Sequence, residues 1–159
     1  MALIDQRERN TVDRARPGVT SGNVAVSYQS IPVAGLRVTA DDHLVLADPI
    51  PRGARITMIH VRFPGAGAIR GNLRFYAAQS GGGINTSRII INTGKTINAT
   101  ASTDADYGIT FSGSSGGELE GDIWGRIIPE TCIPVIDFTT GGTFGSVGPI
   151  VWRDEIIGA

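Results

Sequence analysis

The chain of 159 residues is long enough to bury the core of one domain and too short for two domains of ordinary size. Hydrophobic residues make up 41% of it and charged residues 18%, a composition that excludes wholesale disorder. The formal net charge of −1 gives no global attraction to nucleic acid or to an anionic membrane, and no apolar run is long enough for a transmembrane helix. We therefore expect neither nucleic acid nor a membrane as a partner.

The N-terminal sequence "MALIDQRERN" is charged from the start and has no apolar stretch typical of a secretory signal. Cys132 is the only cysteine, so the fold does not depend on an internal disulfide. These two features predict a soluble protein that is made in a cytoplasm.

Residues 1–23 differ in composition from the rest of the chain. They hold four arginines among three acidic residues and few apolar ones. The segment is either a frayed terminus or an arm that is extended or partly disordered alone and orders against a partner. Arginine side chains can make bidentate contacts to carboxylates on such a partner. The candidate contact residues are Arg7, Arg9, Arg14 and Arg16.

From Val24 onward, apolar residues recur with period two, and turn residues interrupt the pattern about every ten positions. In the segment 55–63 the alternation places Ile59, Val61 and Phe63 on one face and Met58, His60 and Arg62 on the other. In the segment 72–79 it places Leu73, Phe75 and Ala77 on one side. The pattern predicts nine to eleven short strands; a helix over 117–128 is disfavoured by two internal glycines. We expect an all-β fold, with residues 24–159 forming a single antiparallel, jelly-roll-like β-sandwich.

The stretch "IIINTGKTINA", residues 89–99, contains the Gly-Lys-Thr that ends a phosphate-binding P-loop. The motif also requires a glycine five residues before Gly94, where Ile89 stands, and a helix afterwards, where the residues are β-branched and polar. The pattern instead predicts a hairpin turn with Gly94 at the bend.

Other residues that could take part in catalysis or bind a metal do not complete a motif. Ser115 lies in a "GSSGG" run that matches a nucleophile elbow only formally, since both histidines precede it. Asp41, Asp42 and His43 are adjacent and converge only in a turn, and Asp104 with Asp106 does not complete a calcium loop. We predict no catalytic residue, no metal and no cofactor, although an ion at Asp104 and Asp106 is left open. We expect Cys132 to be a small buried hydrophobic residue.

Two stretches, "DDHLVLADPIPRGARITMIHVRF" and "NLRFYAAQSGG", resemble the decoration (cement) proteins of tailed-bacteriophage heads over roughly residues 41–80. The resemblance implies a β-sandwich, often trimeric, that sits on the capsid lattice and clamps neighbouring major capsid protein subunits. An extended terminal arm would reach along the shell. The implied location is the virion, after synthesis in the host cytoplasm.

The leading hypothesis is a non-enzymatic virion structural protein that binds and stabilises a capsid shell. Its expected partners are the major capsid protein and further copies of itself in a homo-oligomer, with a trimer favoured. One alternative is a component of a phage tail tube, tail tip or fibre. Another is a carbohydrate-binding module, which requires aromatic residues such as Trp124, Trp152 and the tyrosines on one exposed face.

Overall fold

The computed structural model describes residues 2–6, 24–64, 69–79, 83–98, 106–112, 127–145 and 148–158, with the backbone alone described for 63–64, 92–98 and 106–112. These segments contain eleven strands: β1 (Leu3–Ile4), β2 (Val24–Ile31), β3 (Arg37–Val38), β4 (His43–Val45), β5 (Arg55–Pro64), β6 (Arg70–Ala78), β7 (Ile84–Asn98), β8 (Asp106–Ser112), β9 (Cys132–Thr140), β10 (Gly142–Thr143) and β11 (Ile150–Ile157). Among the described residues there is no helix, and hence none that could cross a membrane. The prediction of an all-β chain is confirmed.

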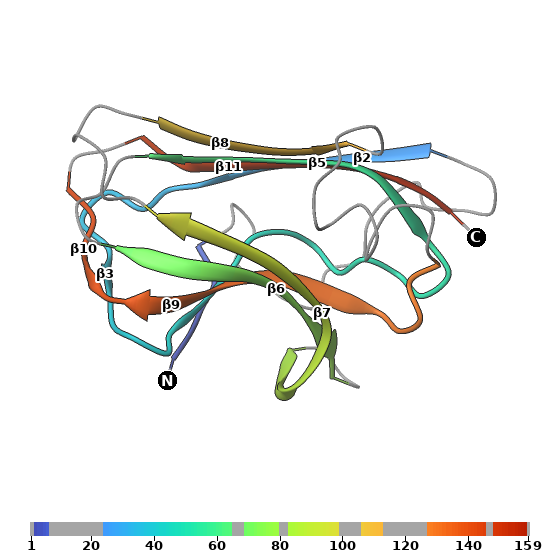
Figure 1. Ribbon diagram of the computed structural model, residues 1–159, viewed down its shortest axis with the longest axis horizontal. Coiled ribbons are helices and arrows are strands. Elements are labelled where there is room, and N and C mark those ends of the chain that lie inside the picture. Colours follow the sequence, from blue (N-terminus) through green and yellow to red (C-terminus); the bar gives the residue numbers. More distant parts are fainter. Residues whose placement is uncertain are drawn as a thin grey trace.

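The strands form two larger sheets and one small one. The five-stranded sheet has the order β1-β4-β9-β6-β7, and the four-stranded sheet has the order β2-β11-β5-β8. The two lie one above the other, and the short β3–β10 pair lies at one end of the molecule (Figure 1).

The strand pairing follows one rule along the whole chain. Strands β2, β4, β5 and β6 pair in turn with β11, β9, β8 and β7, and each of these pairs is antiparallel. The chain is therefore one long antiparallel ribbon, with the outgoing half in residues 24–78 and the returning half in 84–157. The four strand pairs of this ribbon alternate between the two sheets along the chain. In the four-stranded sheet two of the pairs are joined by the contact of β5 with β11, and in the five-stranded sheet the other two are joined by the contact of β6 with β9.

The core lies between the two larger sheets, where the period-two pattern placed it. Ile59 and Val61 of β5 are fully buried, as are Leu73 and Phe75 of β6, which confirms that each of these pairs shares one face of its strand. The ring of Phe75 meets the ring of Trp152 from the other sheet in an edge contact, with centroids 6.2 Å apart. This aromatic pair joins the two sheets directly.

The predicted turn at Gly94 is wrong. Residues 84–98 form the single strand β7, which passes through Gly94 without reversing. Asn72 lies opposite Thr96 and Arg74 opposite Asn92, so two steps along β6 correspond to four along β7. The β-branched flanks favour the extended chain, and the additional residues are absorbed in an irregularity of the β-bulge kind. The hairpin turns instead at Gly83, whose φ is +89° and whose carbonyl accepts from the Gln79 amide at 3.0 Å.

Strand β9 is buried on both of its faces. Cys132, Ile136 and Phe138 belong to the main core, which confirms Cys132 as a buried hydrophobe. Ile133 and Val135 point the other way, into a second apolar cluster with Val45, Tyr76 and Ile84. The outer face of the five-stranded sheet is therefore partly covered, and a group of polar side chains lies beside this second cluster.

Candidate functional site

Four polar side chains meet on the outer face of the five-stranded sheet. One carboxylate oxygen of Asp137 hydrogen-bonds Nδ1 of His43, and the other accepts from the Tyr76 hydroxyl and from Nη1 of Arg74, the last at 2.8 Å. The sheet register places His43 directly opposite Asp137 on β4. On the other side of β9, Arg74 and Tyr76 are alternate residues of β6, opposite Val135 and Ile133, and their long side chains reach the carboxylate along the outer face. Arg74, Tyr76, His43 and Asp137 are named below the buried polar cluster.

The surroundings fix the protonation of two members of this cluster. Burial, with a further contribution from the hydrogen bond to Asp137, raises the pKa of Tyr76 to about 12. The hydrogen bond to Asp137 raises the pKa of Arg74 above its usual value. At neutral pH, Tyr76 is therefore a neutral donor and Arg74 a cation, and both point at one carboxylate.

The buried polar cluster connects three strands of the sheet. It links β4, β9 and β6 across the middle of the sheet, and the rings of His43 and Tyr76 lie 5.3 Å apart. Cys132 is on β9 too, but it belongs to the main core on the opposite face of the sheet. Among the described residues the cluster therefore has the composition of a structural network. Sequence reasoning missed it, because its members are as far apart as residues 43 and 137.

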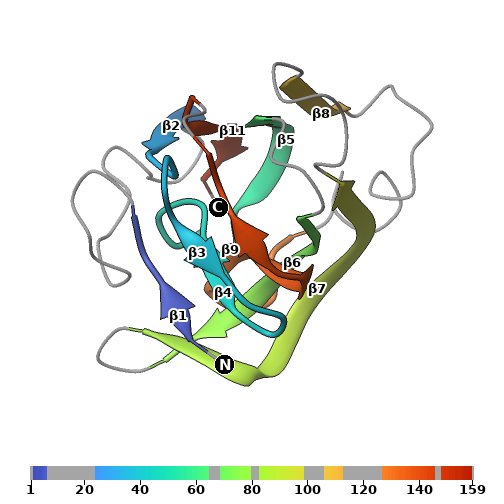
Figure 2. The same ribbon diagram turned by 90° about the vertical axis from the view of Figure 1, so that its left-hand side faces the viewer.

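The first residues of the chain lie along the edge of the same sheet. Leu3 and Ile4 pair in parallel with His43 and Leu44, and the His43 amide donates to the Ala2 carbonyl at 2.8 Å. Figure 2 shows β1 beside β4 at this edge, although residues 1–23 were expected to form an arm. The rest of that segment, residues 7–23, lies outside the described residues.

Asp42 holds this N-terminal strand to the sheet. Its carboxylate accepts from the Ala2 amide at 3.0 Å and from the Thr39 amide at 2.9 Å. Burial by itself acts to raise the pKa of Asp42, but the backbone hydrogen bonds from Thr39 and Ala2 outweigh it, so the pKa lies below its usual value. The ionised carboxylate is thus the form that binds β1.

The adjacent acids and histidine do not converge on an ion. Asp41 has a φ of +73° and is exposed, Asp42 binds backbone amides, and the His43 ring turns to Asp137. No group of three metal-ligating side chains occurs among the residues that the structure describes. Asp104 lies outside them, and Asp106 begins β8 with its backbone alone described.

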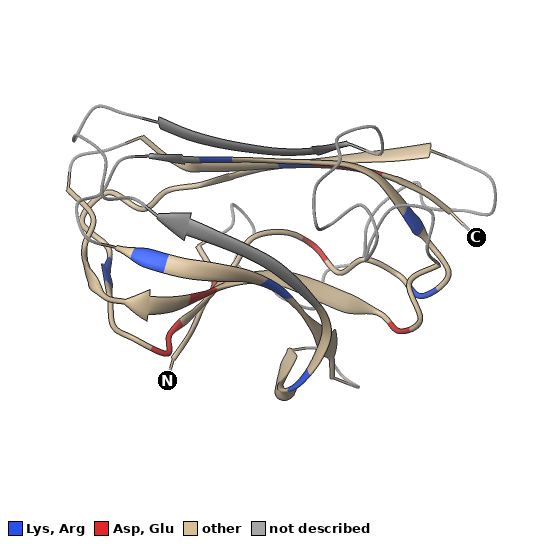
Figure 3. Ribbon diagram, viewed as in Figure 1, with Lys and Arg blue, Asp and Glu red and all other residues tan. Residues whose placement is uncertain are grey.

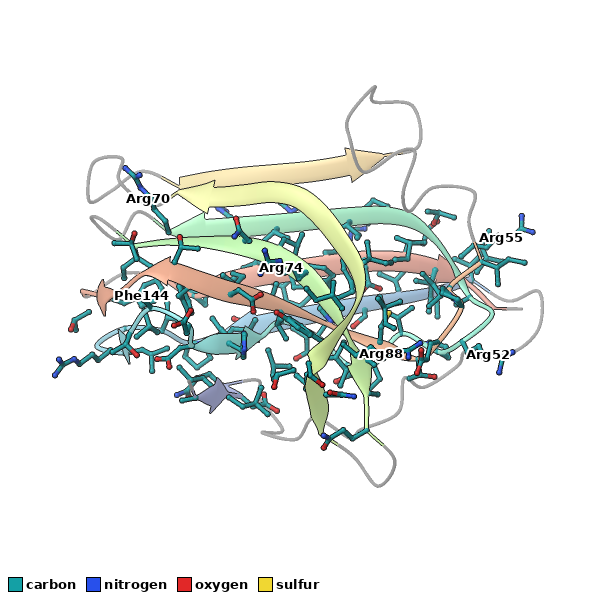
Figure 4. All side chains as sticks on the ribbon, turned by 60° about the horizontal axis from the view of Figure 1, so that its bottom comes forward. Arg52, Arg55, Arg70, Arg74, Arg88 and Phe144 are labelled. Carbon is teal, nitrogen blue, oxygen red and sulfur yellow. The ribbon has the colours of Figure 1, made fainter. Side chains whose placement is uncertain are left out.

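The predicted contact residues Arg7, Arg9, Arg14 and Arg16 also lie outside the described residues, as does Ser115. Other arginines are exposed at both ends of the body: Figure 4 shows Arg70 near one end, Arg52 and Arg55 near the other, and Arg74 between them. Figure 3 shows charged positions on several of the described strands and loops, and they do not gather in one part of the view.

An exposed apolar row runs along strand β2. Val24, Val26 and Tyr28 have exposed fractions of 58%, 56% and 63%, whereas Ala25, Gln29 and Ile31 on the other side of the strand are buried. The signal was present in the sequence "VAVSYQSI", where apolar residues occupy both faces of an alternating strand. Sequence reasoning registered the alternation and missed the apolar outer face.

The aromatic residues proposed for a sugar-binding platform do not gather on the surface. Trp152 and Tyr76 are buried, and Tyr28 is the exposed member among the aromatic side chains that the structure describes. Trp124 lies outside the described residues. The described part of the chain therefore offers no platform of two or three exposed aromatic rings.

No protein-family model matches the sequence, and no curated protein matches it. Two solved structures are similar in fold. A chain of the capsid of Ralstonia phage GP4 matches with a TM-score of 0.59 at 12% identity, covering 99% of this chain and 98% of that one. A chain of the cyanophage Pam1 capsid asymmetric unit matches with a TM-score of 0.50 at 17% identity, covering 93% and 94%. This chain therefore shares its fold, over nearly its whole length, with chains found in two phage capsids.

Proposed function

We propose that this protein is a structural component of a phage virion that binds the outside of the capsid shell and stabilises it as a decoration protein, without catalysis. The observation that carries the proposal is the fold likeness to a chain of the Ralstonia phage GP4 capsid, which spans 99% of this chain and 98% of that one. A likeness that covers nearly all of both chains favours the same kind of building unit.

The topology supports the same proposal. Eight strands, paired as one antiparallel ribbon and divided between two facing sheets, match the jelly-roll arrangement of two Greek keys that is used in viral capsid domains. We assign this arrangement to the chain as a single β-sandwich. Its broad sheet faces and exposed loops suit a unit that makes contacts with several neighbours.

The buried polar cluster agrees with a role without chemistry. Its carboxylate is engaged by three donors, and its strands are held by them. Such a network stabilises a rigid body that must keep its shape on a lattice.

In this proposal, residues 1–23 make the contact with the major capsid protein. Four arginines within ten positions, Arg7 to Arg16, can pair with carboxylates on the shell. Because many copies bind symmetry-related sites, weak individual contacts can gain about 10²–10⁴ in avidity.

The test uses capsid shells from the phage that encodes this chain, prepared without the protein. Added protein should sediment with expanded shells at a saturating ratio and raise the temperature at which they rupture. Binding to isolated tails without binding to shells would instead support the tail alternative.

A pair of matched variants tests the arginine segment. Replacing Arg7, Arg9, Arg14 and Arg16 by serine should abolish sedimentation with shells, as should deletion of residues 1–20. Replacing four exposed arginines of the body by serine should leave binding intact; these are Arg37, Arg52, Arg55 and Arg70. Equal binding by both quadruple variants would show that the arm does not carry the contact.

A further inference from the structure

The four-stranded sheet has an edge strand without the usual protection against pairing. β2 is the first strand in the order β2-β11-β5-β8, and it pairs with β11 alone among the described residues. Natural edge strands are commonly shielded by charges, proline, bulges or short length. The sequence "VAVSYQSI" carries no charge and no proline, runs for 8 residues, and keeps a regular register with β11 from end to end.

Both edges of the five-stranded sheet are shielded. β1, at one edge of the five-stranded sheet, is 2 residues long. β7, at the other edge, carries the exposed Arg88, and its register with β6 shifts three times. Figure 3 shows β2 without a charged position, whereas the sequence of its neighbour β11 includes Arg153, Asp154 and Glu155. Neither of these protections, short length or an irregular register, applies to β2.

The exposed apolar row lies on this same strand. Val24, Val26 and Tyr28 are each more than half exposed. On β11 the positions opposite Val26 and Tyr28 are the charged Glu155 and Arg153. The same face of β11 also carries Val151 and Ile157, whereas the outer face of β2 carries no charge at all, at the edge where a further strand could be added.

We propose that β2 pairs in antiparallel fashion with β2 of a second copy, so that two four-stranded sheets continue into one across a two-fold axis. Val26 then lies opposite Val26 of the second copy, and Val24 lies opposite Tyr28 of the second copy. A strand without charges can face itself without repulsion, and a two-fold contact requires such self-complementarity.

The apolar row selects this register over its neighbours. Residues opposite each other in a sheet share a face, so the pairing can shift only in steps of two. A shift in one direction places Val24 opposite Ser30, and a shift in the other moves Tyr28 beyond the start of the facing strand. Only the central register pairs all three exposed apolar side chains with one another.

The contact is narrow and therefore weak for an isolated pair. In this register residues 24–28 of the two strands face each other over about 17 Å, and such a strand edge buries less than the ~1,200 Å² of a stable interface. We expect a reversible dimer that becomes significant where copies are held close together. The inference does not depend on the proposed capsid role, because it is tested with purified protein and no shell.

The first experiment measures self-association of the purified full-length protein by sedimentation velocity over a concentration series. Wild type should form dimers at the upper concentrations. Val26→Lys places two like charges opposite each other and should weaken association at least about tenfold, the factor equivalent to ~1.4 kcal/mol. Ile89→Lys is the matched control, since Ile89 is an exposed apolar residue on a strand of the other sheet, and it should associate like wild type.

The second experiment tests the register. Val26→Cys should form a disulfide-linked dimer under mild oxidation, whereas wild type, whose single Cys132 is buried, should not. Tyr28→Cys should cross-link with Val24→Cys when the two proteins are mixed, and neither should cross-link alone. A monomer at every concentration, or association that Val26→Lys leaves unchanged, would overturn the proposal. Cross-linking of Tyr28→Cys with itself in preference to Val26→Cys would also overturn it.

Discussion

Replacing Asp137 by alanine should be among the most damaging single substitutions that leave the main hydrophobic core intact. The carboxylate has 7% side-chain exposure and is the common acceptor for Tyr76, Arg74 and His43. Its removal leaves a buried hydroxyl, a partly buried guanidinium and an imidazole without their partner. Nε of Arg74 is already buried without a protein hydrogen bond, so the guanidinium has little else to bind inside the sheet.

The size of the loss follows from these contacts. A hydrogen bond to a charged group contributes about 1.5–3 kcal/mol, and removing one partner of a buried ion pair costs about 3–5 kcal/mol. Arg74 keeps 28% side-chain exposure, so water can recover part of its solvation and the lower half of that range applies. We expect Asp137→Ala to cost about 3–4 kcal/mol, a large fraction of a typical stability of ~5–15 kcal/mol.

The assay is equilibrium unfolding in urea, followed by circular dichroism and by the fluorescence of the fully buried Trp152. With a slope of roughly 2 kcal/mol per molar urea, the midpoint should fall by about 1.5–2 M. Glu130→Ala is the matched control, because it also removes a carboxylate from an arginine, here Arg88 at 2.6 Å, but both side chains are exposed, at 41% and 61%. That variant should lose less than about 1 kcal/mol.

One result would refute this reasoning. If Asp137→Ala and Glu130→Ala shift the urea midpoint by the same small amount, the buried polar cluster does not hold β4, β9 and β6 together. A double-mutant cycle of Asp137→Ala with Tyr76→Phe gives an independent check, since side chains in direct contact should show a coupling energy above about 0.5 kcal/mol.

Three further predictions follow from other contacts. The raised pKa of Tyr76 means that the neutral hydroxyl stabilises the fold fully below pH 10 and that this contribution is lost as pH rises toward 12. The free energy of unfolding of the wild type should fall by about 2–3 kcal/mol over that range. A similar fall in Tyr76→Phe would contradict the assignment of the loss to Tyr76. The lowered pKa of Asp42 means that its stabilisation is present above pH 3.8 and disappears on acidification. Asp42→Asn should therefore speed amide hydrogen exchange in residues 3–4 at pH 7. The difference in stability between this variant and the wild type should vanish in acid. Gly141→Ala should lower the thermal midpoint, because its Cβ would lie 2.5 Å from a backbone oxygen, while Gly145→Ala, with open space around it, should leave the midpoint unchanged.

Much of the fold could be predicted from local patterns. The alternation in 55–63 and 72–79 identified two strands and the residues that share a face of each, and the isolated Cys132 in an apolar run was recognised as buried. These predictions succeed because a strand with one face in the core must alternate with period two, whatever it pairs with. The prediction of a turn at Gly94 failed because a glycine beside β-branched residues suits a bulge as well as a turn. Only the pairing with the partner strand distinguishes a bulge from a turn.

The candidate site depends on contacts between distant parts of the chain. His43 and Asp137 are separated by 94 positions, and neither residue is unusual in its own segment. They meet because the ribbon folds back on itself and fixes β4 opposite β9, a register that arises from the packing of the whole sheet. The same folding leaves β2 at an edge, which turns an ordinary alternating strand into an exposed apolar one.

The sequence alone thus determined that the chain forms an all-β fold, and it identified the strands in 55–63 and 72–79, since alternation follows from side-chain periodicity within a few residues. The tertiary structure alone decided which strands are neighbours, which polar side chains meet at Asp137, and which strand keeps a free edge. Those properties depend on how the two halves of one long ribbon are paired, and pairing energies accumulate only between segments that the chain must first bring together.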